Sequence, residues 1–320
     1  MEKNIIFDTM IYRYIGKLLK NKSEDEKDRF KHCFFIAEKE QGFKPLFSIL
    51  VGMELLSHLR NKDQHYEECK EGLLFAYEHS PQSFMPYPDI LFTQYFFSYS
   101  CESYRKFLSC FADVWNRIFL FKGSNEVILE SLERIEGFSN ELEDIKQEIL
   151  NLIVKSVEFA GEPHRANKHS VFPNNDKERT KIRNYIENNK DEYHKSLASS
   201  FLKRMAFLSH VENINDEANK IQYLIDNHKA VFEKFRKINL KMIDSKDLNL
   251  ANPKKKSLNE FTDCLIIMSL SPSANNIFVT EEKKNIEIIK SVGLQDWLII
   301  RDEYFKKIGL ENVIQNCFKE

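Results

Sequence analysis

The chain has 320 residues, 42% of them hydrophobic and 30% charged, so it can bury a sizeable core beneath a charged surface. Only 9 Gly and 8 Pro argue against a turn-rich all-β sandwich and favour helices. The apolar runs are too short to cross a bilayer, the first ten residues lack a secretory pattern, and the 6 cysteines form no close pair. We therefore expect no membrane association and a reducing, cytoplasmic location.

The first 60 residues are expected to alternate between strand and helix. Residues 4–7 predict a short apolar strand that ends at Asp8, followed by an amphipathic helix over 9–19 that is capped by Thr9. A second helix is expected to end near residue 42. Pro45 suits the first turn of a third helix, which contains Glu54 and is apolar on nearly every side.

Residues 61–256 predict helices with few strand signals. Helices are expected over 65–78, 88–121 and 125–159, and three more between 176 and 242. A polar loop over 161–176 and a linker over 245–257 separate these groups.

After residue 257 the alternation of strand and helix returns. Asp263 lies in a predicted buried helix, and a short strand then leads to Glu281 and Glu282. A helix, a strand and a last helix follow. Such alternation implies an α/β fold with a parallel sheet flanked by helices. We expect residues 1–60 and 257–320 to form one discontinuous domain, and 61–256 to form an all-helical insertion that binds substrate or a partner.

Charge is unevenly distributed along the chain. The net charge is −2, but residues 161–256 carry 20 Lys and Arg against 13 Asp and Glu, a balance of +7 that leaves −9 elsewhere. A basic region beside acidic ends fits a protein that holds phosphates in one place and cations in another. The residues expected to contact a phosphate backbone are Lys177, Arg179, Lys181 and Arg183. A solvated helix face, or a surface for a partner or a second copy of the chain, is the alternative.

Several acids share an unusual setting, because each lies in or against an apolar run. Asp8 ends IIFD, Glu54 lies inside ILVGMELL, and Asp263 lies inside FTDCLIIM. Glu281 and Glu282 end IFVTEE. An unpaired carboxylate in such a setting costs several kcal/mol, so these acids are expected to be paired or to bind a cation. None of the four runs contains Lys or Arg.

In this order the segments resemble the PIN-domain nuclease family. The matching pieces are FDTMIY with Asp8, LVGMELLSHL with Glu54, EFTDCLIIMSLS with Asp263 and IFVTEEKK with Glu282. The tail WLIIRDEYFKKIGL is similar to the family's closing strand and helix. The resemblance covers about residues 1–60 and 257–310. Two features depart from the family: an Asp is usual where Glu282 stands, with Glu281 as a rival, and the middle of the chain is far longer.

The resemblance implies a metal-dependent endonuclease, expected to act on RNA or another single-stranded nucleic acid. One or two Mg²⁺ or Mn²⁺ ions would be held by these carboxylates. Thr9 and Thr280 would orient the carboxylates or a bound water, although a helix cap and a strand end explain them equally well. The family also includes toxins and defence effectors. A PIN-like domain without metal, acting as a binding scaffold, is the first alternative.

A second alternative rests on Arg60 and His65, which fit the RNxxxH pattern of HEPN ribonucleases. Those enzymes cleave RNA without a metal and often act as paired protomers. Arg204 and His210 fit a looser version of the pattern. His65 with Cys69 and His164 with His169 are further candidates for zinc. Short patterns of this kind arise by chance, so the carboxylate site is the preferred hypothesis.

Overall fold

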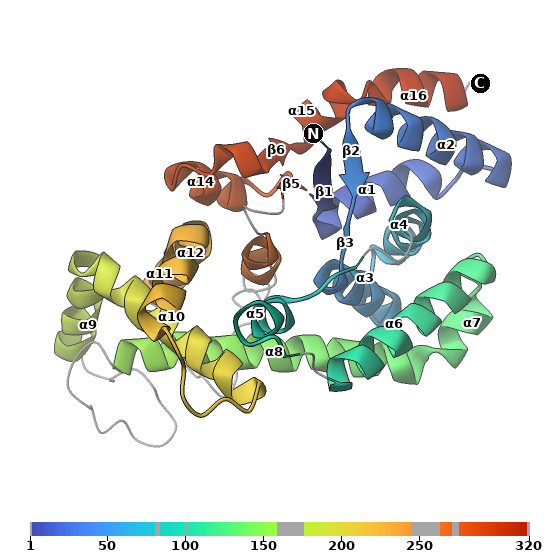
Figure 1. Ribbon diagram of the computed structural model, residues 1–320. Coiled ribbons are helices and arrows are strands. Elements are labelled where there is room, and N and C mark those ends of the chain that lie inside the picture. Colours follow the sequence, from blue (N-terminus) through green and yellow to red (C-terminus); the bar gives the residue numbers. More distant parts are fainter. Residues whose placement is uncertain are drawn as a thin grey trace. The chain divides into compact units, whose positions relative to one another are not determined.

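The computed structural model describes residues 2–80, 84–99, 102–158, 176–244, 263–270 and 275–318. Within them the fold is helix-rich α/β with a small parallel sheet (Figure 1). Contacts divide the chain into two units. The sheet unit comprises Met1–Tyr87, Cys101–Leu142 and Ser269–Glu320, and the helical unit comprises Pro88–Ser100 and Glu143–Met268. These boundaries differ from those expected at 60 and 257, since much of the expected insertion packs with the sheet.

The main sheet contains β1 (Lys3–Phe7), β2 (Phe43–Pro45), β5 (Asn276–Thr280) and β6 (Leu298–Ile300). The strand order is β2-β1-β5-β6, and every pairing is parallel. The expected parallel sheet is therefore confirmed. A second sheet pairs two short strands, β3 (Phe47–Ser48) and β4 (Phe84–Met85), which the sequence did not predict.

The connections that follow the two central strands, β1 and β5, cross to opposite sides of the sheet's centre. From β1 it passes through α1 (Thr9–Leu19) and α2 (Glu24–Glu40) to β2, on one side of β1. From β5 it passes through α14 (Lys283–Ser291) to β6, on the other side. Open α/β sheets bind their ligands at the carboxyl ends of strands where the order reverses in this way. The ends of β1 and β5 are such a switch point.

The start of α1 differs from the expectation that Thr9 caps this helix. Asp8 is the cap, because its Oδ1 accepts a hydrogen bond from the backbone N of Ile11 at 2.9 Å. Thr9 is the first residue of the helix, and its hydroxyl has a different partner. An Asp at this position satisfies one of the backbone N–H groups that the first turn leaves unpaired.

Pro45 does not begin a helix, as the sequence predicted. It ends β2, where it pairs with Ile5 of β1, and α3 (Ile49–Asn61) begins only after β3. Proline is tolerated there because β2 lies at the edge of the sheet, where one side of the strand needs no donor. Pairing with a distant strand thus overrode a local helix signal.

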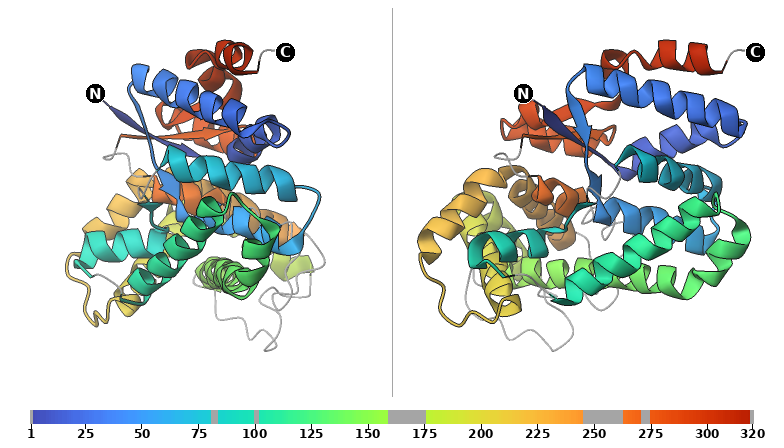
Figure 2. Two further views of the ribbon diagram at one scale, coloured as in Figure 1. Left: turned by 90° about the vertical axis from the view of Figure 1, so that its right-hand side faces the viewer. Right: turned by 45° about the vertical axis from the view of Figure 1, so that its right-hand side comes forward.

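Helices α1 and α4 (Tyr66–His79) lie side by side (Figure 2). Their backbones touch at two glycines. A Cβ at Gly16 would overlap the Glu68 carbonyl oxygen and lie 2.7 Å from the Gly72 nitrogen. A Cβ at Gly72 would lie 2.6 Å from the Tyr12 carbonyl oxygen. This close crossing fixes the side chains of α1 against those of α4.

A buried polar network joins helices of the sheet unit. The carboxylate of Glu38 lies 2.7 Å from Nε2 of His79 and accepts a hydrogen bond from Tyr304 of α15 (Arg301–Lys307). The Tyr12 hydroxyl lies 3.5 Å from Nδ1 of His79. Burial raises the pKa of both tyrosines. The rings around the imidazole belong to Phe7, Tyr12, Phe34, Phe35 and Phe75. Such a network specifies how these helices pack.

The remaining helices refine the expected boundaries. The expected helix over 88–121 is two, α5 (Pro88–Phe97) and α6 (Glu102–Leu120), and that over 125–159 is α7 (Asn125–Glu130) and α8 (Leu132–Glu158). Four helices rather than three occupy the next described stretch, namely α9 (Asp176–Asn188), α10 (Lys190–Leu208), α11 (Glu217–Asn227) and α12 (Lys229–Asp244). A 3₁₀ turn (Gln295–Trp297) precedes β6, and α16 (Leu310–Cys317) follows α15.

Residues 263–269 are helical, as expected. The expected loop over 161–176 and the linker over 245–257 lie almost entirely outside the described residues. Within the described part of the chain, no helix has both the length and the apolar character needed to cross a membrane.

Candidate metal centre

Asp8 and Thr280 meet at the switch point of the sheet. Asp8 is 5% exposed, and while one carboxylate oxygen caps α1, the other accepts a hydrogen bond from the Thr280 hydroxyl. The buried Thr280 oxygen in turn accepts a hydrogen bond from the backbone N of Glu282 at 3.0 Å. These contacts tie the ends of β1 and β5 together across 272 positions of sequence.

Glu54 reaches the same edge of the sheet from α3. Its Oε2 accepts a hydrogen bond of 2.6 Å from the Thr9 hydroxyl. Thr9 follows Asp8 directly, so this bond ties the Glu54 carboxylate to the residue next to Asp8. Both threonines therefore donate to a carboxylate, which is the orienting contact expected of such residues beside a metal site.

The two neighbouring glutamates after β5 differ in their partners. Glu281 forms an ion pair with Arg301, which also bonds Asp302 at 3.0 Å and lies 4.8 Å over the ring of Tyr14. Glu282 stands at the N-cap of α14, and its carboxylate has no hydrogen bond or ion pair within the described residues. Glu282 therefore suits a cation better than Glu281 does.

Asp263 belongs to the helical unit, whereas Asp8, Glu54 and Glu282 belong to the sheet unit. Its Oδ2 accepts a hydrogen bond of 3.3 Å from Nζ of Lys234, whose side chain is 3% exposed. A buried ammonium thus compensates this carboxylate. The structure brings Asp8 and Glu54 together at the edge of the sheet, with Glu282 after the neighbouring strand.

The ligand chemistry of the sheet-unit acids fits a hard divalent cation. Carboxylate oxygens are the ligands that Mg²⁺ and Mn²⁺ prefer, and Mg²⁺ is commonly held by one or two of them with phosphate and water as the other ligands. Among the described residues, no group of three or more His, Cys, Asp or Glu side chains is already gathered closely enough to hold a metal ion.

Polar side chains extend from Glu54 toward the start of α4. His58 follows Glu54 by one helical turn, and its Nδ1 lies 2.5 Å from Oδ2 of Asp63. Asp63 also accepts a hydrogen bond from the backbone N of His65, and despite a desolvation cost that opposes it, bonding to His58 and His65 lowers its pKa. Asp63 is thus an ionised turn residue that orients the imidazole of His58.

Arg60 and His65 bond to different partners. Arg60 pairs with Glu136 of α8 at 2.6 Å, whereas Nδ1 of His65 lies 3.3 Å from Glu68. Burial raises the pKa of the Cys69 thiol to about 12, and among the described residues no three His, Cys, Asp or Glu side chains gather closely enough to hold a metal ion with it.

Arg204 and His210, the looser match to the HEPN pattern, also contact other residues. Arg204 donates to Asp89 at 2.9 and 2.7 Å and contacts Glu148, and the His210 ring faces that of Tyr99. His164 and His169, the other zinc candidates, lie outside the described residues.

The basic residues expected to grip phosphate lie on α9 in the helical unit. Lys177, Lys181 and Arg183 are exposed, and Arg179 is half-buried. Arg183 forms ion pairs with Glu187 at 3.2 Å and with Asp244 at 3.3 Å, so carboxylates partly compensate this surface.

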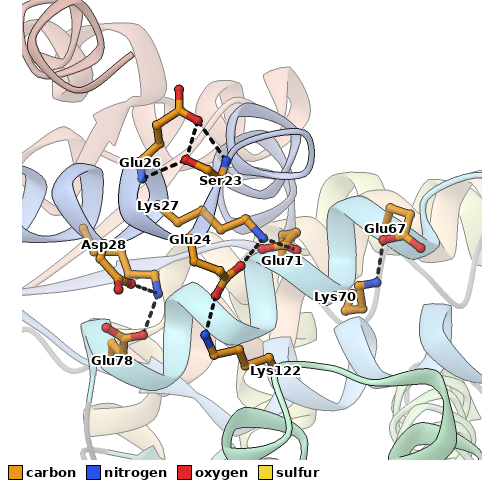
Figure 3. Close-up of polar contacts among 11 residues, drawn as sticks. Ser23, Glu24, Glu26, Lys27, Asp28, Glu67, Lys70, Glu71, Glu78 and Lys122 are labelled. Atoms are coloured by element: carbon orange, nitrogen blue, oxygen red, sulfur yellow. Dashed lines mark hydrogen bonds and ion pairs between the residues drawn. The ribbon is translucent and has the colours of Figure 1, made fainter. Parts of the chain in front are cut away.

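A hollow of about 490 Å³ lies against α2, α4 and the end of α6 in the sheet unit. Each lysine that lines it is paired with a carboxylate (Figure 3). Lys27 bonds Glu71 at 2.8 Å and Lys31 bonds Glu78 at 2.7 Å, both across helices. The lining has three lysines and four acids, and it offers no free ammonium to a phosphate.

None of the family models, curated proteins and solved structures with which we compared the chain matches it. Its function has to be argued from the geometry of the site.

Proposed function

We propose that this protein is a metal-dependent endonuclease of PIN-like type that hydrolyses phosphodiester bonds in RNA or another single-stranded nucleic acid. One observation carries the proposal. The carboxylates of Asp8 and Glu54 lie at the switch point of a parallel sheet, each held by a threonine hydroxyl. Open α/β sheets bind ligands at this place, and two oriented carboxylates are a starting set for a divalent cation.

In this proposal Asp8, Glu54 and Glu282 hold Mg²⁺ or Mn²⁺. The ion, when bound, supplies a Lewis acid that activates water and stabilises the departing oxygen. The hydroxyls of Thr9 and Thr280 restrict the rotation of the Glu54 and Asp8 carboxylates, because each donates to one of their oxygens. Oriented carboxylates lose less conformational entropy when they bind a cation.

We leave Asp263 and Glu281 out of the proposed ligands. Each already has a cation as its partner, Lys234 for Asp263 and Arg301 for Glu281. Replacing an ammonium or a guanidinium by a metal ion would leave that cation without its carboxylate, which costs free energy where the cation is buried.

The proposal is tested by cleavage of a labelled single-stranded RNA with Mn²⁺ or Mg²⁺. We expect EDTA to abolish cleavage, and Asp8→Asn and Glu54→Gln each to lower its rate at least about a hundredfold, the scale seen when a group acting in the transition state is removed. Asp113→Asn, an exposed acid on α6, is the matched control and should cleave normally. Wild-type rates in both site variants would refute the proposal.

A binding scaffold is the second candidate, and one observation favours it. Both oxygens of Asp8 already have partners, as expected of a purely structural helix cap. A scaffold would neither bind Mn²⁺ nor cleave RNA in any variant. Cleavage that persists in EDTA and is lost in His65→Ala would instead support the metal-independent mechanism.

A further inference from the structure

Arg13 of α1 has a poorly satisfied guanidinium and lies one helical turn after Thr9. Its side chain is 16% exposed. Nη1 donates to the sulfur of Met10 at 3.3 Å, and Nη2 lies 3.9 Å from an oxygen of Glu68. Nε is buried and has no hydrogen-bond partner in the described part of the chain. A guanidinium has five N–H donors, and leaving one buried without an acceptor costs free energy, so this arrangement requires an explanation.

The ion pair with Glu68 does not explain why the Arg13 guanidinium is left poorly satisfied. The same carboxylate also receives Lys20 at 3.5 Å and lies 3.3 Å from the imidazole of His65. Arg13 has the longest of these contacts, at the outer limit of an ion pair. Glu68 is thus shared by two permanent cations and a histidine. Arg13 therefore shares this single acid with Lys20.

The position of Arg13 relative to the site follows from the helix. Thr9 and Arg13 are one turn apart on the same face of α1, and Thr9 bonds Glu54. The glycine crossing of α1 and α4 holds the Arg13 backbone in place.

We propose that Arg13 binds the non-bridging oxygens of a phosphodiester next to the Asp8 and Glu54 carboxylates. This inference rests on the proposed nuclease function. Carboxylates alone repel a polyanion, so a site built from them needs a cation of its own in the sheet unit. The planar fork of arginine matches two phosphate oxygens at once, which a lysine ammonium does not.

The test uses the full chain and a fluorescent single-stranded oligoribonucleotide. In Ca²⁺, chosen to limit cleavage, we expect Arg13→Gln to raise the Kd about tenfold or more, the effect of losing a charge-assisted hydrogen bond. The slope of log Kd against log salt should fall by about 0.7 for the lost phosphate contact. Arg13→Lys, which keeps the charge but not the fork, should fall between. Binding of Mn²⁺ alone should remain within twofold of wild type.

Two controls separate phosphate binding from structural support. Arg117→Gln removes an arginine whose side chain is 42% exposed and which pairs with Glu130 at 2.8 Å, and should change neither Kd nor slope. Glu68→Gln removes the shared carboxylate and should tighten binding, since Arg13 would lose its competing acid. Equal losses of thermal stability in Arg13→Gln and Glu68→Gln, with wild-type Kd and slope, would overturn the inference.

The two proposals fail in different ways. A wild-type protein that cleaves RNA with Mn²⁺ while Arg13→Gln and Arg13→Lys retain its Kd and salt slope would refute the role of Arg13 alone. A wild-type protein that neither binds Mn²⁺ nor cleaves would refute the nuclease itself, and the Arg13 inference with it.

Discussion

The sheet unit and the helical unit each hold an acid that the sequence expected at one metal site, and they hold it differently. Asp8 is bound by a hydroxyl and a backbone N–H, both neutral donors. Asp263 is bound by the ammonium of a buried lysine, Lys234. Neutral donors fix a carboxylate without cancelling its charge, whereas an ammonium cancels it. The apolar sequence around an acid indicates that it has a partner, but not whether that partner is charged.

The largest expected effect is a difference between two variants, one of which should lose activity and the other stability. Asp8→Asn should abolish cleavage with little change in thermal stability, because Asn caps a helix about as well as Asp. Asp263→Asn should leave cleavage within about threefold of wild type but destabilise the protein by about 1 to 3 kcal/mol, since a buried ammonium loses an ionised partner. Cleavage assays and thermal unfolding of both variants measure the two effects.

The contrast would break if Asp263→Asn removed activity as completely as Asp8→Asn while remaining equally stable. Asp263 would then be a ligand, as the sequence first suggested, and its contact with Lys234 would be secondary.

The glycine crossing beneath the site offers a test confined to the sheet unit. Gly16→Ala should destabilise the protein by about 2 kcal/mol or more, because its Cβ would overlap backbone atoms that cannot move aside. Gly137→Ala on α8 is the matched control: a Cβ there would meet no heavy atom within 4 Å. It should stabilise the protein by up to about 1 kcal/mol through helix propensity alone. Denaturant unfolding compares the two, and equal effects would contradict the close crossing.

The helical unit should be the more sensitive to acid. Burial lowers the pKa of His228 to about 3 and that of His194 to about 4, from 6.5. As the pH falls, these two histidines therefore bind protons in the unfolded state before they do so in the folded state. Stability should be complete above pH 6.5 and decline as the pH falls toward 3, by up to about 1.4 kcal/mol per pH unit for each histidine.

Hydrogen exchange between pH 7 and 5 checks this prediction by the protection of α10 and α12. His228→Phe should reduce the pH dependence of stability, because it removes the titratable imidazole. A phenyl ring suits the position, since the imidazole packs edge-on against Phe92 with ring centroids 4.9 Å apart. Neither of its ring nitrogens has a hydrogen-bond partner in the described residues. An unchanged pH profile in this variant would show that other groups control the acid response.

The sequence predicted those parts of the fold that local patterns determine. The apolar runs of β1 and β5, the amphipathic α1 and α14 and the parallel sheet all follow from periodicity and from acids at strand ends. Pro45 was misinterpreted because its partner, Ile5, lies far away in sequence. Local patterns cannot show which distant strand or helix will supply a partner.

The same limit applied to the site. Asp8 and Glu54 were predicted as ligands from their apolar surroundings, and Thr9 and Thr280 as orienting residues from their positions next to predicted ligands; the structure shows the Thr9–Glu54 and Thr280–Asp8 contacts. The role proposed for Arg13 could not be predicted from the sequence, because a basic residue in an amphipathic helix is ordinary, and its contact with Glu68 of α4, which also pairs with Lys20, appears only in the fold. The pairing of Lys234 with Asp263 was missed for the same reason, since 29 positions separate them.

The separation of 272 positions between Asp8 and Thr280 has a consequence for synthesis on the ribosome. Chains emerge from the amino end at about 5 to 20 residues per second, so β1 waits many seconds before β5 can pair with it. Until then the Asp8 carboxylate lacks Thr280, and the acid after β5 has not been made. The contact that joins the ends of β1 and β5 therefore forms only after nearly the whole chain has been synthesised.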